Sequence, residues 1–295
     1  MKPLLLYLPL FALLFSGCCA KPKQELIACG EDKVFILDFE SSTESQPNII
    51  WSWTAGEATD LPEIYRTKHL IPFDECKPVD SNTKILLTSS GGGVVLLDKA
   101  TKKSLFYAYC PMAHSAEMLP NNRIAVANST HPEGNSLEIY DIDTPERVIF
   151  KDSLYSGHGV VWMDKHKLLF ALGFDDLRAY SLKNWDSDLP ELALEKTWLI
   201  PSEGGHDLIR ISDNELIVTE HESLWVFSIA DETFSVFEPL ANVHNVKSVN
   251  YNPSTGQLVY TKAETSWWTN NIYCENPEKV LHFPEIKLYK ARISQ

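Results

Sequence analysis

The sequence is short of positive charge: its 295 residues include 26 Lys and Arg against 40 Asp and Glu, a formal net charge of −14. A negative surface repels polyanions, so nucleic acid is not expected as a partner, and neither is an anionic membrane surface. Long apolar runs are missing after Phe15, and none approaches the roughly 20 residues that a membrane-spanning helix needs. The body of the chain is therefore expected to be water-soluble.

Several catalytic motifs are also missing. There is no Gly-x-Ser-x-Gly nucleophile elbow and no His-Glu-x-x-His metal motif. Gly91–Gly93 lies between two strand-like runs with no helix after it, so we interpret it as a hairpin turn and not as a phosphate-binding loop. None of the four cysteines of the body has Cys-x-x-Cys spacing, which disfavours a zinc site and leaves free buried thiols or a single disulfide open. These cysteines are Cys29, Cys76, Cys110 and Cys274.

The N-terminus has the features of an export signal. Lys2 precedes an apolar run that ends in Phe15-Ser16-Gly17-Cys18, which resembles the lipobox of bacterial lipoproteins. Cys18 is the predicted lipid acceptor; cleavage near Ala20, or acylation of Cys19, is the alternative. We therefore expect an exported protein, anchored only by lipid on the periplasmic side of a bacterial membrane, with the outer membrane as the expected one. The predicted divisions are a signal peptide at 1–17, a lipidated linker at 18–24 and a folded body at 25–295.

Three segments of the body align without gaps: His114–Val126, His158–Phe170 and His206–Val218. Each reads as a strand, a polar turn and a second strand, and two further strand-like runs follow each pair. Looser copies start near Glu75 and Asn245. Four strands per repeat with a period near forty residues is typical of a β-propeller blade, and no convincing amphipathic helix interrupts the pattern.

The ends of the chain complete the count. The N-terminal part of the body offers three strands, and Ile286–Ile293 offers one. Joining them gives a last blade and removes two exposed sheet edges. The predicted fold class is therefore an all-β, six-bladed β-propeller whose last blade is closed by the C-terminal strand, with seven blades as the alternative.

The repeat alignment places a set of polar residues at the same position of the innermost strands. Glu75, His114, His158 and His206 share this position, and His244 and Asn245 lie close to it in another repeat. One interpretation is structural, because blades of the WD kind carry a Gly-His pair for a hydrogen-bond network. The other is a ligand site, including a divalent metal (Mn, Zn or Fe). The predicted metal ligands are His114, His158, His206, His244 and Glu75.

The segment from Glu264 to Asn271 contains two adjacent tryptophans, Trp267 and Trp268, beside amides. Aromatic faces with neighbouring hydrogen-bonding groups suit sugar rings, although one Trp filling the channel and the other packing between blades would also explain them. The predicted substrate-binding residues are Trp267, Trp268, Glu264, His221 and Asn245. Lys247, Lys262, Lys290 and Arg292 are candidate partners for a carboxylate; of these, Lys290 is expected to be solvated and Arg292 to form a buried pair.

Several stretches resemble an uncharacterised family of secreted bacterial propeller proteins. They are Ala113–Pro120, His158–Trp162, Gly205–Leu208, His244–Ser248, Ser266–Thr269 and Tyr289–Arg292. At the level of the fold the chain is also similar to propeller polysaccharide lyases such as oligogalacturonate lyases. That likeness implies a metal or Arg292 on a uronate carboxylate and His206, His158 or Lys247 as the catalytic base.

Two functional hypotheses from different classes follow. The first is a lyase that acts on uronate-containing oligosaccharides at a central pocket lined by histidines. The second is a non-catalytic lipoprotein that binds a glycan or another small ligand, or that serves as a scaffold for other proteins. Whether the protein is an enzyme stays open at this point.

Overall fold

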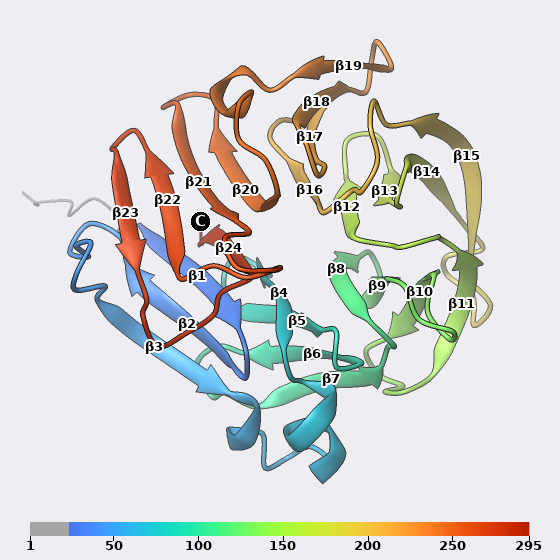
Figure 1. Ribbon diagram of the computed structural model, residues 1–295. Coiled ribbons are helices and arrows are strands. Elements are labelled where there is room, and N and C mark those ends of the chain that lie inside the picture. The colour runs from blue at the N-terminus through green and yellow to red at the C-terminus, as the bar shows by residue number, and fades with distance from the viewer. Residues whose placement is uncertain (1–23, 295) are drawn as a thin grey trace, which may run out of the picture.

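The computed structural model describes residues 24–294, which form six four-stranded antiparallel sheets arranged radially around a channel (Figure 1). The predicted six-bladed propeller is confirmed. The signal peptide, the lipid acceptor Cys18 and most of the linker lie outside the described residues. Within residues 24–294, no helix is long and apolar enough to cross a membrane.

The innermost strands of the six blades line the channel. They are β24 (Lys290–Ser294), β4 (Phe73–Val79), β8 (Ala113–Leu119), β12 (Gly159–Met163), β16 (Asp207–Arg210) and β20 (Val246–Asn252). The second strands are β1 (Glu25–Gly30), β5 (Lys84–Ser89), β9 (Arg123–Asn128), β13 (Leu168–Leu172), β17 (Glu215–Thr219) and β21 (Gln257–Lys262).

Exposure rises at the outermost strand of each blade, whereas third strands such as β2, β6 and β10 are almost fully buried. The third strands are β2 (Lys33–Asp38), β6 (Gly93–Asp98), β10 (Ser136–Asp141), β14 (Asp176–Lys183), β18 (Leu224–Ser228) and β22 (Asn271–Glu275). The outermost strands are β3 (Ile49–Thr54), β7 (Ser104–Tyr109), β11 (Val148–Ser153), β15 (Glu191–Leu199), β19 (Thr233–Val236) and β23 (Lys279–His282). In the described part of the chain, helical structure is limited to short turns: 3₁₀ turns at Ala55–Glu57 and Glu238–Leu240, and a π turn at Tyr65–His69.

The closure of the ring has the predicted form. β24 pairs with β1 in the order β24-β1-β2-β3, so the last strand of the chain becomes the innermost strand of the first blade. The strand begins at Lys290, later than predicted, because Leu288 forms a bridge with Thr269 in the facing loop before the chain enters the sheet. Both termini of the body are therefore held in one sheet.

The hydrophobic core lies between adjacent blades. Trp53 of β3 packs on Phe73 of β4 with ring centroids 5.9 Å apart, and Phe170 of β13 packs on Phe227 of β18 at 6.2 Å. All four cysteines of the body are buried and free. Of the two predicted alternatives, free buried thiols and a single disulfide, the structure has the free thiols. With no bridge among these four, packing between blades and the closure by β24 hold the ring together.

Candidate active site at the histidine end of the channel

The entrance of the channel is shaped by β-bulges. The pairing of β4 with β5 skips Asp74, that of β8 with β9 skips His114, and that of β20 with β21 skips Lys247. A bulged residue has no partner on the neighbouring strand, so the strand bends there and the side chain of the bulged residue changes direction. The equivalent residues of the other three blades, just before their inner strands begin, bond through backbone N–H groups to the second strand. We call the resulting set the mouth ring: Asp74, His114, His158, His206, Lys247 and Tyr289.

The mouth ring differs from the predicted one at two blades. Glu75, predicted at the level of His114, lies one residue deeper. Asp74 takes its place because the turn between β4 and β5 (80–83) is one residue longer than the turn between β8 and β9 (120–122). Lys247, and not His244 or Asn245, is the equivalent residue in β20. His244 is exposed and lies against Glu222, with its Nδ1 atom 2.7 Å from the Glu222 carbonyl. The predicted metal set is therefore not assembled. Among residues 24–294, no group of three or more His, Cys, Asp or Glu side chains is arranged to hold a metal ion.

The predicted clustering of histidines does occur. Ring centroids are 4.5 Å apart between His114 and His158, 5.6 Å between His158 and His206, and 4.6 Å between His206 and His221. Burial lowers the pKa of His114 to about 4 and holds the pKa values of His158 and His206 well below their usual range. These three imidazoles are therefore neutral at pH 7.

Backbone contacts fix the tautomers of two of these rings. His114 Nδ1 lies 3.0 Å from the carbonyl oxygen of Met112, and His158 Nδ1 lies 2.7 Å from that of Ser156. A carbonyl only accepts hydrogen bonds, so each Nδ1 carries the proton and each Nε2 has a free lone pair. The mouth ring therefore offers imidazole nitrogens that accept hydrogen bonds from a ligand.

Lys247 is the unusual cation of this site. Its side chain is buried, with 1% of the residue exposed, and Nζ lies 2.7 Å from His206 Nε2. The ring of Trp267 covers it at 5.0 Å. Burial, together with the positive charge of Lys290, lowers the pKa of Lys247 to about 7. A buried lysine is normally paired with a carboxylate, but within residues 24–294 no carboxylate forms a salt bridge with Lys247.

Asp74 was not selected from the sequence. It is buried, accepts a hydrogen bond from the Ser90 N–H, and has a pKa raised by burial to about 7. The repeat alignment selected its neighbour in sequence, Glu75. The turn at 80–83 has one residue more than the turn at 120–122, so Asp74 is the residue of β4 that matches the bulged His114 of β8.

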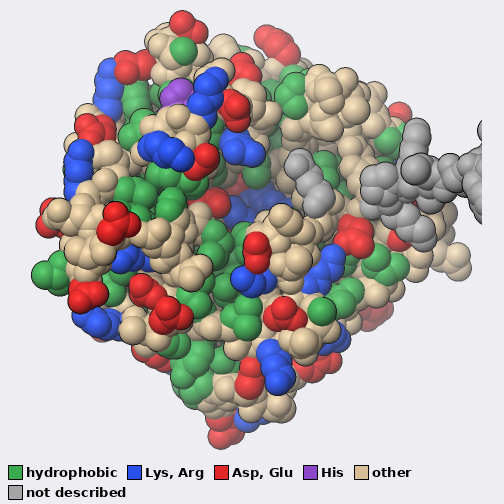
Figure 2. Space-filling model, turned by 180° about the vertical axis from the view of Figure 1, so that it is seen from behind, with side chains coloured by type: hydrophobic (Ala, Val, Ile, Leu, Met, Phe, Trp, Pro, Cys, Tyr) green, Lys and Arg blue, Asp and Glu red, His purple; other side chains and the backbone are tan. Residues whose placement is uncertain are grey.

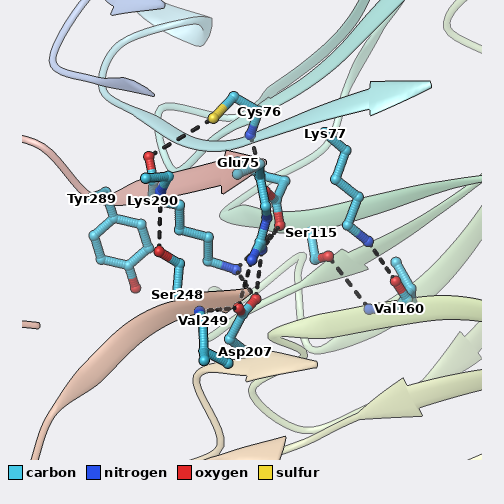
Figure 3. Close-up of polar contacts among 12 residues, drawn as sticks. Glu75, Cys76, Lys77, Ser115, Val160, Asp207, Ser248, Val249, Tyr289 and Lys290 are labelled. Carbon is cyan, nitrogen blue, oxygen red and sulfur yellow. Dashed lines mark hydrogen bonds and ion pairs between the residues drawn. The ribbon is translucent and has the colours of Figure 1, made fainter. Parts of the chain in front are cut away.

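Four buried charged side chains, those of Glu75, Asp207, Lys290 and Arg292, meet inside the ring of blades; Figure 3 shows their contacts. Arg292 Nη2 lies 2.6 Å from both Glu75 Oε2 and Asp207 Oδ1, and Lys290 Nζ lies 2.9 Å from Asp207 Oδ1 and 3.3 Å from Glu75 Oε2. The expected buried pairing of Arg292 is confirmed. The expectation that Lys290 is solvated was wrong, because its side chain is 0% exposed. Arg292 is thus held by the carboxylates of Glu75 and Asp207 and does not reach the mouth ring. Glu75 is in turn bound by Arg292 and Lys290.

The charges of this cluster balance one another. Although burial raises the pKa of Glu75, the nearby Arg292 and Lys290 lower it more, to about 2. The same opposition holds the pKa of Asp207 well below its usual range. Two carboxylates and two cations are therefore ionised together, and they tie β24 to β4 and β16.

The tryptophan loop covers one side of the mouth. Trp267 is 55% exposed and lies over Lys247, while Trp268 packs on Tyr289 with centroids 5.6 Å apart. Glu264 does not face the mouth ring: it accepts hydrogen bonds from Asn271 and other groups of its own loop and so fixes the loop's shape.

The remaining predicted residues lie beside the ring. His221 Nδ1 is 3.1 Å from His206 Nε2, which extends the row of imidazoles. Asn245 contributes its backbone: its N–H donates to the His221 carbonyl oxygen at 2.8 Å, with a positive φ of 57°. Asn245 therefore positions the start of β20 and thus Lys247.

The other end of the channel opens into a cavity of about 810 Å³. Figure 2 shows this face with a central hollow and Lys and Arg side chains at its floor. Its lining includes Lys77, Glu117, Trp162, Tyr251 and Arg292. Lys77 Nζ is bound to Glu117 at 3.0 Å, and Arg292 belongs to the buried cluster, so these two cations on the floor are neutralised.

Residues 26–294 match the family of unknown function DUF6528. The chain belongs to this family. The resemblance to an uncharacterised propeller family is thereby confirmed, and the family brings no activity with it. No curated protein matches the chain. Among solved structures, the chain is similar to one titled "Crystal Structure of Mitotic Checkpoint Complex", with a TM-score of 0.57, 10% identity, and coverage of 85% of this chain and 69% of that one. A likeness at this identity concerns the propeller fold alone.

Proposed function

We propose that this protein is a carbohydrate-active enzyme, a lyase that cleaves uronate-containing oligosaccharides at the mouth ring. The observation that carries the proposal is the contact between Lys247 Nζ and His206 Nε2, 2.7 Å apart beneath an exposed tryptophan. It supplies a lysine that is partly neutral at pH 7, in contact with an imidazole and beside an aromatic face that suits a sugar ring.

The reaction is a β-elimination. Neutral Lys247 removes the proton on the carbon next to the uronate carboxylate, a carbon–carbon double bond forms, and the glycosidic carbon–oxygen bond breaks. The leaving oxygen takes a proton from the neutral form of Asp74, whose pKa of about 7 leaves it partly protonated. His206 then accepts the proton that Lys247 has taken up, and His221 beside it continues the path towards solvent.

Substrate binding follows from the same residues. The free Nε2 atoms of His114 and His158 accept hydrogen bonds from sugar hydroxyl groups, and Trp267 stacks on the apolar face of a ring. Arg292 is buried in its ion pairs, so the uronate carboxylate needs another cation. Lys262 is the candidate, because it pairs with Val246 next to Lys247 and is half-buried. Its Nζ lies 4.6 Å from the centroid of the Tyr273 ring, so the side chain must turn away from that ring to meet the carboxylate.

The test is an assay of the purified folded body on a panel of uronate oligosaccharides, followed by the ultraviolet absorbance of the unsaturated product. Lys247→Ala should lower kcat by about 10²- to 10⁴-fold, the usual contribution of a positioned base. Trp162→Ala, at the opposite end of the channel, is the matched control and should retain activity. Absence of product on every uronate substrate, or full activity of Lys247→Ala, would refute the proposal.

A second candidate function, non-catalytic glycan binding, is favoured by the cavity of about 810 Å³ at the other end. Its size is within the range of ligand sites, and Trp162 and Tyr251 flank a floor whose Lys77 and Arg292 are already paired, which suits an uncharged polar ligand. Titration calorimetry with neutral oligosaccharides distinguishes the two functions. Binding that is lost in Trp162→Ala and kept in Trp267→Ala assigns the glycan to the cavity; no binding eliminates this candidate.

We also propose that lipid on Cys18 tethers the protein to the periplasmic side of a bacterial membrane. Gln24 lines the cavity, and the six residue-to-residue steps from Cys18 to Gln24 span at most about 20 Å. The tether therefore brings the cavity end close to the membrane and leaves the mouth ring facing away from it. Radiolabelled fatty acid should be incorporated by the wild type and not by Cys18→Ala; equal labelling of both would refute this.

A further inference from the structure

Lys247 differs from the other buried lysines of the channel. Lys290 is bound by two carboxylates and Lys77 by Glu117. Lys247 has a histidine nitrogen at 2.7 Å and a tryptophan ring at 5.0 Å instead. An ammonium group without a carboxylate is costly to bury, so this environment favours the neutral amine.

A neutral lysine amine is a nucleophile as well as a base. Two conditions activate lysines for attack on carbonyl carbons: removal from water and a second cationic group nearby. Lys247 meets both, since burial and the charge of Lys290 lower its pKa to about 7.

We propose that Lys247 forms an imine with the carbonyl carbon of a hydroxy-aldehyde, such as the open-chain form of a reducing sugar. This activity goes beyond the elimination reaction and does not depend on it.

The step balances without an added oxidant or reductant. The Lys247 nitrogen bonds to the aldehyde carbon, and one of its two amine protons passes through His206 to the carbonyl oxygen, which gives a carbinolamine. The second amine proton passes through His206 to the hydroxyl group, which leaves as water while a carbon–nitrogen double bond forms. His206 is placed for both transfers because its Nε2 contacts Lys247 Nζ and His221 Nδ1.

The hydroxylated class of ligand follows from the mouth ring. His114 and His158 present lone pairs on Nε2, which hydroxyl groups can satisfy as donors. An aldehyde without hydroxyl groups would leave both nitrogens without a partner. Trp267 is the cover that the ligand must displace, since it lies over Lys247 from an exposed loop.

The test uses glyceraldehyde as the probe, with sodium cyanoborohydride to reduce any imine to a stable secondary amine, and peptide mass spectrometry to locate it. Lys167, 71% exposed, is the internal control. At pH 7 about half of the Lys247 amines are neutral, against about one in 2,500 for an ordinary lysine of pKa 10.4. Allowing for restricted access, Lys247 should be labelled at least about 10-fold faster than Lys167.

Two variants make the outcome decisive. Trp267→Ala removes the cover and should accelerate labelling of Lys247 without changing that of Lys167; His206→Ala should slow it. Labelling of Lys167 but not of Lys247, in both the wild type and Trp267→Ala, would overturn the inference. The elimination assay contains no reductant and follows only the unsaturated product, so failure of one proposal is separate from failure of the other.

Discussion

Replacing Glu75 by glutamine removes one of the two carboxylates that hold Lys290 and Arg292 inside the channel. The variant keeps the shape of the side chain, but it leaves two buried cations facing one remaining carboxylate, Asp207. Removing one partner of a buried ion pair typically costs about 3 to 5 kcal/mol, because the opposite charge stays buried without compensation. Since domains of this kind are stable by only about 5 to 15 kcal/mol, the loss should be a large part of the total.

The assay is urea denaturation followed by intrinsic tryptophan fluorescence at pH 7. Glu75→Gln should lower the free energy of unfolding by the stated amount with an unchanged m-value. The double variant Glu75→Gln/Lys290→Met restores the balance of charge and should recover part of the loss. Asp164→Asn, which removes an exposed carboxylate paired with Lys167, is the control and should leave the midpoint unchanged.

The pH dependence has a fixed sign. The folded pKa of Glu75 is depressed to about 2, whereas an unfolded glutamate titrates near about 4.3. The stabilisation is therefore complete above about pH 4.3 and is lost as the pH falls towards 2. A loss below 1 kcal/mol in Glu75→Gln, or equal acid sensitivity of wild type and variant, would refute the view that this cluster holds the ring closed.

Three further predictions concern the closure, the mouth and its support. Deleting β24 should abolish cooperative unfolding, because the first blade loses its innermost strand; a sigmoidal thermal transition in the truncated protein would contradict this. Activity should follow a bell-shaped pH profile centred near pH 7, since Lys247 acts unprotonated and Asp74 protonated; a rate that is flat from pH 5 to 9 would exclude the pair. Gly204→Ala should impair activity and lower the unfolding free energy by about 1 to 3 kcal/mol. Gly204 has a φ of +79°, and an added Cβ would lie 1.8 Å from the His221 ring. The control Gly56→Ala, with open space around the position, should change activity little.

Much of the fold was predictable because it depends on local patterns of strands and turns in the sequence. Three gapless repeats, each opened by a histidine, fixed the strand period, and the unmatched strands at the two ends implied the closure by β24. The clustering of His114, His158 and His206 followed from the same alignment. These features depend on the alternation of side chains along a strand and on the number of strands, both of which the order of residues specifies.

The composition of the site was less predictable, because turn lengths and bulges change which residue reaches the mouth without changing the hydrophobic pattern of the strands. One additional residue in the turn at 80–83, compared with the turn at 120–122, placed Asp74 and not Glu75 at the mouth, and the bulge in β20 placed Lys247 there. An alignment without gaps detects neither the added residue nor the bulge.

The sequence by itself determined the number of blades, the manner of closure and the row of histidines, since each follows from periodic local choices along the chain. Only the tertiary structure decided which charges meet. Lys290 is buried because Glu75 and Asp207, which are far away in sequence, both pair with it. These two carboxylates are bound to Lys290 and not to Lys247, whose partner is His206. Pairing of this kind depends on distances across the channel between different blades, and only the closed ring sets those distances.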